Sequence, residues 1–313
     1  MLPILLKTLP FFAIIGLGYW AGRVRFFSPE ATSYLTKFVF YFALSAMLFG
    51  FAANLSLAEI YSNQFVLAYL AGSLIVYLLA FGVALARKAS VDEAAVEAQC
   101  SVVGNTGFLG VPMLVVLLGT GAAGPVLMVL SIDLIVFSSL ISLIMAGIRS
   151  GRVSFATVRA LAVGLLANPM IVSMTLGLVW SYSGYLVPAP VNEFLTILGA
   201  AATPGALFAI GASLATKSTE RLAVAVWLSC CKLVLHPVAV AICALLVFSV
   251  PAQEAGVMIA AAALPVAGNV YILAQHFGVA PQRVSTSILL STAVSIITVS
   301  AVIAWVTPMV NAP

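Results

Sequence analysis

The chain has 313 residues, of which 63% are hydrophobic and 7% are charged, with a formal net charge of +4; its mean hydropathy is +1.20. A soluble domain carries roughly 25% charged residues, so this composition excludes a water-soluble globular protein. The small net charge gives no indication of nucleic-acid binding, and the lipid bilayer is the partner to expect. Continuous apolar runs such as residues 65–86 lack the alternating pattern of a membrane β-barrel, so we predict an all-α polytopic membrane protein.

Ten apolar stretches have roughly the 20 residues that a helix needs to cross a bilayer core. The predicted transmembrane helices are 3–22, 32–52, 63–86, 92–118, 122–148, 159–182, 191–215, 221–249, 253–277 and 284–307. Ser28, Pro29 and Glu30 precede the second helix, as expected of a helix start. The first apolar run continues past Trp20 without a cleavage signal, so we interpret it as a membrane span and not a signal peptide.

The ten predicted helices divide into two halves of five, residues 1–150 and 151–313. The second and seventh helices share short matches at an offset of 160 residues, such as Leu35-Thr36 with Leu195-Thr196. An odd number of helices in each half makes the second half enter the membrane from the opposite side. The sequence therefore predicts an inverted repeat, which in transporters forms a site near the membrane midplane.

Basic residues indicate the orientation, because cytoplasmic loops of membrane proteins carry an excess of Lys and Arg. Eleven of the 13 fall on one side of the predicted helices: Arg23, Arg25, Lys37, Arg87, Lys88, Arg149, Arg152, Arg159, Lys217, Arg221 and Arg283. Only Lys7 lies on the other side, and Lys232 lies inside a helix. We therefore predict a protein of the cell (inner) membrane with both termini on the outer side.

The fourth and ninth predicted helices are interrupted at equivalent places. The fourth contains Gly104, Asn105, Thr106, Gly107 and Pro112, and the ninth contains Pro265, Gly268 and Asn269. Glycine and proline break an ordinary helix, and irregular backbone at membrane depth needs protein or a water-filled cavity around it. Although single kinks often serve packing alone, a matched pair of broken helices favours a substrate-binding site.

Three ionisable side chains fall deep inside predicted helices, far from either end: Asp133, Lys232 and His236. Such residues are costly in a bilayer and indicate function by default. Lys232 is either a charge that attracts an anion or half of an internal ion pair with Asp133. Asp133 suits proton coupling or that ion pair, and His236 either has a coupling role or bonds a carbonyl freed by the proline that follows it. Glu97 is expected to be satisfied near the cytoplasmic end of the fourth helix.

The run from Gly104 to Pro112 resembles the Asn-Thr-x-x-x-Gly-x-Pro signature of the auxin efflux carrier family. Further similarities are Ala263-Leu264-Pro265, Ala274, the turn Val279-Ala280-Pro281, Asn168-Pro169 and the segment Lys232 to Pro237. The resemblance implies ten helices in an inverted repeat, with the fourth and ninth crossing at their breaks. It also implies secondary transport of small organic acids such as malate, malonate or auxin-like acids, and a homodimer. The short central loop favours the microbial branch of the family.

Two positions depart from the family pattern. Val270 stands where plant members have a second proline, so the ninth-helix break can differ from theirs, and Ser45 replaces a proline that is frequent in the second helix. A sodium-coupled bile-acid-type symporter is the alternative with the same architecture. It is less favoured because the breaks lack acidic ligands.

Other classes of protein find less support in the sequence. An intramembrane enzyme needs a nucleophile–base pair or a metal cluster, and the two histidines with the buried aspartate do not form one. The four cysteines, Cys100, Cys230, Cys231 and Cys243, lack metal-binding spacing and are interpreted as small membrane-embedded residues. We therefore expect no cofactor and no metal site.

Overall fold

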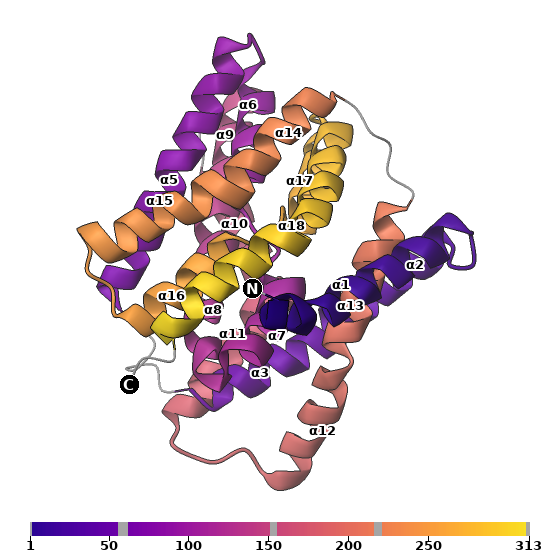
Figure 1. The fold of residues 1–313 in the computed structure, drawn as a ribbon, viewed down its shortest axis with the longest axis vertical. Coiled ribbons are helices and arrows are strands. Elements are labelled where there is room, and N and C mark those ends of the chain that lie inside the picture. Colours follow the sequence, from indigo (N-terminus) through magenta and orange to yellow (C-terminus); the bar gives the residue numbers. More distant parts are fainter. Residues whose placement is uncertain (1, 56–61, 151–154, 216–220, 311–313) are drawn as a thin grey trace.

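The computed structural model describes residues 2–55, 62–150, 155–215 and 221–310 (Figure 1). These residues form helices, and the one β-type contact among them is an isolated bridge between Gly104 and Val266. The α-helices are α1 Leu2–Arg23, α2 Pro29–Phe38, α3 Leu44–Ala53, α5 Asn63–Ala86, α6 Val91–Val102, α7 Val111–Leu118, α8 Ala123–Ile132, α9 Ser138–Ser150, α10 Phe155–Leu166, α11 Pro169–Tyr182, α12 Ala189–Ala200, α13 Ala202–Leu214, α14 Leu222–Cys230, α15 His236–Ile242, α16 Ala252–Ala262, α17 Gly268–Phe277 and α18 Pro281–Val310.

Short helical turns of other kinds join several of these α-helices into longer rods. A 3₁₀ turn, η3, spans Thr120–Ala122. The π-helical turns are η1 Val39–Ala43, η2 Thr106–Gly110, η4 Asp133–Phe137, η5 Cys231–Leu235 and η6 Cys243–Val247. Because π-turns are rare and often lie at functional sites, it is notable that Thr106, Asp133 and Lys232 each occupy one.

Seven helices in the described part of the chain are long and apolar enough to cross a membrane. They are Ile4–Arg23, Pro29–Ala53, Asn63–Ala86, Thr120–Ile148, Ala189–Leu214, Leu222–Val247 and Pro281–Val310, and each matches one predicted span. The predicted fourth and ninth spans are instead pairs of short helices, so they do not count as continuous spans. An integral multi-pass membrane protein is confirmed, whereas the number of ten and the inverted repeat stay predictions.

The predicted sixth span, 159–182, is not one straight helix. Val158–Leu166 and Pro169–Tyr182 pass the span test together but are bent by 68°. The Asn168 side chain caps α11 by accepting a hydrogen bond from the Met170 N–H at 3.0 Å. Proline has no N–H and disfavours a helical conformation in the residue before it, which explains why the helix breaks here.

Two groups of helices pack mainly among themselves (Figure 1). The first, which we call the frame, comprises α1, α2, α3, α11, α12 and α13, and the second, which we call the core group, comprises α5, α6, α8, α9 and α14–α18. Within the frame, α1 and α13 touch backbone to backbone: a Cβ on Gly18 would lie 2.1 Å from the Phe208 oxygen, and one on Gly211 would lie 1.9 Å from the Ile15 oxygen. Only glycine permits such an approach.

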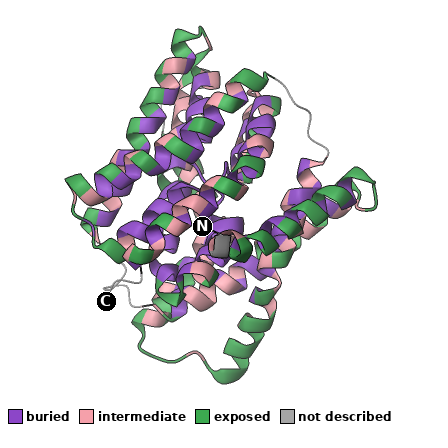
Figure 2. Ribbon diagram, viewed as in Figure 1, coloured by how far each residue is buried: buried purple, intermediate pink, exposed green. Residues whose placement is uncertain are grey.

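Burial runs opposite to that of a soluble protein. Large apolar side chains such as Leu78 and Leu246 are 64% and 77% exposed, whereas Asp133, Lys232 and His236 are at most 2% exposed. The exposed surface covers the outer faces of the helices (Figure 2). Arg152 and Lys217, on which the predicted orientation partly rests, lie outside the described residues, as does the side chain of Arg149.

Candidate functional site

The interruptions lie where the sequence predicts them, and the two broken segments contact each other. α6 ends at Val102 and the chain becomes helical again at Thr106, while α16 ends at Ala262 and α17 begins at Gly268. The Asn105 N–H donates to the Pro265 oxygen at 2.8 Å, and the Ala267 N–H donates to the Val103 oxygen at 3.1 Å. Together with the bridge between Gly104 and Val266, these bonds form a short antiparallel crossing inside the protein.

The crossing satisfies backbone groups that lose their helical partners at the breaks. Unpaired groups of this kind cost several kcal/mol at membrane depth. The Asn105 oxygen accepts from the N–H groups of Leu109 and Gly110 at 3.1 and 2.9 Å, and the Val266 N–H donates to Ser291 Oγ at 3.1 Å. The sequence interpretation missed Ser291 of α18, although serines at positions 287, 291 and 295 are spaced one helical turn apart.

Two predicted asparagines leave side-chain groups unused at this crossing. Asn105 precedes the helical turn at Thr106, and its side chain does not cap that turn. Asn269 Oδ1 is buried and has no hydrogen-bond partner among the described residues. α17 also starts without a side-chain cap, because its N-cap residue is Ala267. Uncapped N–H groups at a helix N-terminus are suited to bind an anion, whereas the Asn269 oxygen can only accept a hydrogen bond.

Asp133 contacts the broken fourth helix from a neighbouring rod. Its Oδ1 accepts from the Tyr69 hydroxyl at 2.9 Å, and its Oδ2 lies 3.5 Å from Thr106 Oγ1. Tyr69 of α5 is 1% exposed and is another residue that the sequence interpretation missed. The pattern of Tyr69 and Ser73 one turn apart in an otherwise apolar span was the available signal.

Lys232 contacts the broken ninth helix. Its ammonium donates to the oxygen of Ala262, the last residue of α16, and Nζ lies 3.0 Å from Nδ1 of His236. The Nδ1 atom is also 3.2 Å from the Ala262 oxygen, and Ser73 Oγ lies 2.9 Å from His236 Nε2. A cation at the C-terminus of a helix interacts favourably with its dipole. Lys232 therefore caps the half-helix that ends at the crossing.

Lys232 and Asp133 interact electrostatically but do not touch. The ion pairs within 4.0 Å in the described part of the chain are Arg87–Glu97, Arg283–Glu93 and Arg283–Glu97. A Cβ on Gly104 would lie 3.3 Å from Lys232 Nζ, so the crossing backbone lies beside both charged groups. The alternative of an ion pair in direct contact does not describe this conformation.

The remaining predicted site residues differ in how tightly they are packed. A Cβ on Gly107 would lie 2.4 Å from Met170 Cε, whereas one on Gly268 would meet nothing within 4 Å. Gly268 thus leaves the start of α17 open to a ligand. Pro112 is buried near the start of α7, in the second half of the broken fourth helix and away from the bridge.

Replacing Gly104 by alanine should reduce transport strongly while the protein still inserts. The added methyl group would lie 3.3 Å from Lys232 Cε and Nζ and 3.4 Å from the Ala261 oxygen, so Lys232 must shift by a few tenths of an ångström at the end of α16. Overpacking a filled interior costs about 1–3 kcal/mol. The measurement is uptake by proteoliposomes, with Gly82→Ala as the matched control, because a Cβ on Gly82 would meet nothing within 4 Å. Equal uptake by the two variants would contradict the tight fit at Gly104.

A separate cluster of charges lies where α5, α6 and α18 meet. Glu97, which is 1% exposed, accepts from Arg87 and, at 2.6 Å, from Arg283, and Arg283 also reaches Glu93 at 3.0 Å. The expectation that Glu97 is satisfied by neighbours is confirmed, and this cluster ties the core group together at one end.

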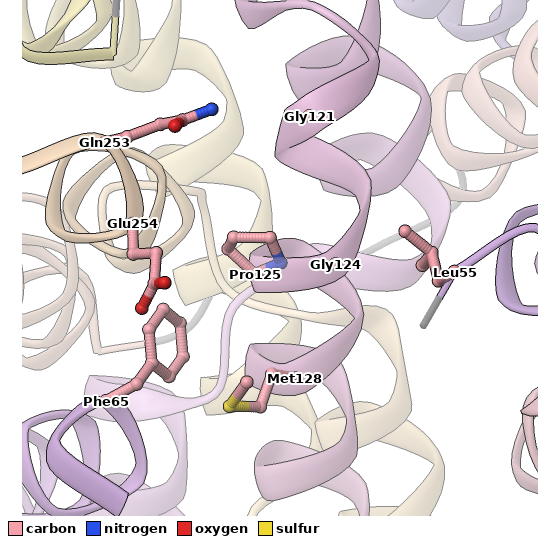
Figure 3. A pocket seen from close by; sticks show the side chains of 8 residues that line it. All are labelled: Leu55, Phe65, Gly121, Gly124, Pro125, Met128, Gln253 and Glu254. Carbon is pink, nitrogen blue, oxygen red and sulfur yellow. The ribbon is translucent and has the colours of Figure 1, made fainter. Parts of the chain in front are cut away.

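A cavity of about 340 Å³ lies away from the crossing, between the starts of α5, α8 and α16 (Figure 3). Its lining residues are Leu55, Phe65, Gly121, Gly124, Pro125, Met128, Gln253 and Glu254. In the close-up the Glu254 carboxylate lies over the ring of Phe65, and its Oε2 atom has no partner among the described residues. None of the predicted site residues lines it.

Comparison of the sequence with known proteins identifies its family. The model of the membrane transport protein family matches residues 3–303. The chain belongs to the membrane transport protein family. This match confirms the resemblance to the auxin efflux carriers over nearly the whole length. The chain is also similar to a protein of Rhizobium meliloti (strain 1021) named "Putative malonate transporter", with 29% identity over 296 residues, which cover 94% of this chain and 92% of that protein.

Membership of the membrane transport protein family gives the buried crossing a context. The family model includes both broken segments, the Asp133 turn and the Lys232 turn, since all lie between residues 3 and 303. The chain is therefore a membrane transporter, and the crossing is the feature of its interior that joins polar side chains to irregular backbone.

Proposed function

We propose that this transporter is a secondary carrier of small organic anions, with malonate-like dicarboxylates as the first candidates, and that the anion binds where the two broken helices cross. The observation that carries the proposal is the buried crossing itself, where two helices start again without side-chain caps. The name of the Rhizobium meliloti relative supports the choice of dicarboxylates.

The chemistry of the crossing suits a carboxylate. The N-terminus of a helix carries a positive partial charge of roughly half a unit, and the helical segments beginning at Thr106 and Gly268 both start at the crossing. The side-chain NH₂ groups of Asn105 and Asn269 can donate hydrogen bonds, and Gly268, where a Cβ would meet nothing within 4 Å, leaves the backbone at the start of α17 open. Neutral donors and dipoles hold an anion without trapping it, as a carrier requires for release.

Alternating access follows from the same arrangement. The proposed carrier has ten membrane helices in an inverted five-plus-five repeat, and the site opens to one face of the membrane at a time. The excess of basic residues on one side of the predicted helices supports an orientation with both termini on the outer side. Reporter fusions after Lys88 and after Leu118 check this orientation: the first should report the cytoplasm and the second the outside, and the same side for both would contradict it.

Replacing Asn105 or Asn269 by alanine should weaken the binding of every accepted anion. A lost hydrogen bond to a charged group is worth about 1.5–3 kcal/mol, which corresponds to roughly 10- to 100-fold in affinity. The measurement is uptake and binding of malonate, malate and monocarboxylates by proteoliposomes, with and without sodium and proton gradients. Asn54→Ala and Asn192→Ala are controls, because both residues are exposed.

The outcome separates the proposal from its competitors. If both variants at the crossing bind and transport like the parent while correctly inserted, the site lies elsewhere and the breaks serve only as hinges. Strict dependence on sodium would instead favour the bile-acid-type symporter.

A further inference from the structure

We infer that five buried side chains, Lys232, His236, Ser73, Tyr69 and Asp133, form a proton relay that runs around the crossing and couples anion binding to proton uptake. The inference rests on the proposed function for its substrate, but its geometry is independent of which anion is carried. Tyr69 and Ser73 are thereby assigned as proton-carrying residues of the transporter.

Three of the four links of the relay are short contacts between enclosed polar atoms. Lys232 Nζ lies 3.0 Å from His236 Nδ1, and His236 Nε2 lies 2.9 Å from Ser73 Oγ. Ser73 is one turn along α5 from Tyr69, so the two buried hydroxyls lie on the same face of the helix, and the relay passes between them there. The Tyr69 hydroxyl donates to Asp133 Oδ1 at 2.9 Å. All five side chains are at most 2% exposed.

The donors and acceptors can be arranged in one consistent direction. An ammonium has only donors, so Lys232 must donate to His236 Nδ1. A neutral imidazole that accepts at Nδ1 carries its hydrogen on Nε2, from which it donates to Ser73. Ser73 then donates to the Tyr69 oxygen, and Tyr69 donates to Asp133. Every hydrogen in the chain points from the lysine toward the carboxylate.

This arrangement permits a balanced proton shift. Lys232 gives one proton to His236 Nδ1, His236 releases its Nε2 proton to Ser73, Ser73 passes its own to Tyr69, and Tyr69 passes its own to Asp133. The ammonium becomes an amine, the carboxylate becomes a carboxylic acid, and the imidazole changes tautomer. The sum of the charges is zero before and after, and the reverse shift restores the starting state.

A relay is needed because the direct route is occupied. A Cβ on Gly104 would lie 3.3 Å from Lys232 Nζ, and Thr106, two residues further along the same segment, lies 3.5 Å from Asp133 Oδ2 through its Oγ1 atom. The peptide chain at the crossing therefore stands beside both ends of the relay. A proton moving between them travels along α5, where Tyr69 and Ser73 face the π-turns that carry Asp133 and Lys232.

The relay gives the carrier a means to match the charge of its substrate. An ionised Asp133 would repel an arriving carboxylate, whereas an ionised Lys232 would attract it. The state that suits a bound anion is therefore Lys232 as ammonium with Asp133 as carboxylic acid. That state holds one proton more than the empty carrier, taken from solvent, and the relay lets a proton accepted at one end reach the other.

The charged and titratable groups that act on the relay side chains are themselves members of the relay. Asp133 acts on Tyr69 and Lys232, and Lys232 acts on Asp133 and His236. The cluster of Glu97, Arg87, Arg283 and Glu93 is closed on itself by its own ion pairs. Among the described residues, therefore, the charge of the relay is set by its own two ends.

The test compares two tyrosine-to-phenylalanine variants on one helix. Tyr69→Phe removes a hydroxyl of the relay, whereas Tyr77→Phe removes a buried hydroxyl without a hydrogen-bond partner, two turns further along α5. Each protein is reconstituted in vesicles with a trapped pH-sensitive dye, and both malonate-driven proton entry and malonate counterflow are measured. We expect Tyr69→Phe to lose at least tenfold in proton entry while its counterflow stays within a few-fold of the parent, and Tyr77→Phe to keep both.

A second measurement needs no substrate. Infrared spectroscopy in D₂O follows the exchange of the Asp133 carboxylic proton at acidic pH, and the band is identified by its loss in Asp133→Asn. We expect exchange to slow at least tenfold in Tyr69→Phe and not in Tyr77→Phe. Exchange at the parent rate in Tyr69→Phe, or parent-like malonate transport without proton movement, would overturn the relay and leave the proposed function standing. Slowed exchange without transport of any tested acid would support the relay and contradict the proposed substrate.

Discussion

Transport by a Lys232→Met variant should fall roughly 10- to 100-fold, and a second substitution, Asp133→Asn, should not restore it. Methionine keeps the length and apolar packing of the lysine stem but cannot donate to the Ala262 oxygen or to His236. A hydrogen bond involving a charged group contributes about 1.5–3 kcal/mol. The end of α16 therefore loses its cap at the crossing, where the anion is proposed to bind.

The double variant distinguishes the cap from an internal ion pair. If the role of Lys232 were only to neutralise Asp133, removing both charges would recover most of the activity. The structure argues against this, since Lys232 and Asp133 are not among the ion pairs of the described residues and Lys232 already bonds the α16 carbonyl. The measurement is proteoliposome uptake normalised to inserted protein, with Lys88→Met as control, because Lys88 is exposed in the turn after α5. Full recovery in the double variant would disprove the capping role.

The largest loss of stability is expected from Glu97→Ala. Glu97 is 1% exposed and accepts from two arginines, of which Arg283 has a side chain only 6% exposed. Removing one partner of a buried ion pair leaves an uncompensated charge and costs about 3–5 kcal/mol. The check is the unfolding midpoint of the purified protein in detergent, followed by tryptophan fluorescence.

Two further variants give this prediction its controls. Glu193→Ala changes an exposed carboxylate and should leave the midpoint within experimental error of the parent. Glu97→Leu combined with Arg283→Met replaces the pair with apolar groups and should recover much of the loss, because buried ion pairs are often no more stabilising than well-packed hydrophobic residues. A Glu97→Ala midpoint equal to that of the parent would mean that Arg283 finds other partners.

The positions of the breaks could be predicted from the sequence, but their partners could not. Gly104 and Pro265 each interrupt a helix through their own backbone chemistry, which is a local property. The bond between the Asn105 N–H and the Pro265 oxygen joins residues far apart in the chain, and no local pattern gives that pairing. Lys232 and Asp133 could be identified as buried charges because burial follows from the hydropathy of the surrounding residues. Their contacts could not be predicted, because a contact depends on how each helix is rotated about its axis.

The relay residues show the same limit in another form. Tyr69 and Ser73 look like ordinary residues of an apolar span, and tyrosine and serine are common enough in membrane helices to give no signal alone. Their proposed role depends on the π-turns η4 and η5, which carry Asp133 and Lys232 and lie against α5 in the fold. Ser291 was overlooked because its span contains many hydroxyl side chains, and only the Val266 N–H distinguishes it from the others.

The glycine contact between α1 and α13 has a mechanical consequence. With Gly18 and Gly211 each pressed against a carbonyl of the opposite helix, neither helix can slide along the other without forcing one backbone into the other. The frame is therefore rigid along the axes of α1 and α13. The crossing is held by its own hydrogen bonds, so we expect its two backbone segments to move together. Relative motion is therefore expected at the contact between the frame and the rest of the protein, where α1 packs against α18 and α13 packs against the turn at Thr106–Gly110. A disulfide engineered across this contact would lock the carrier in one state.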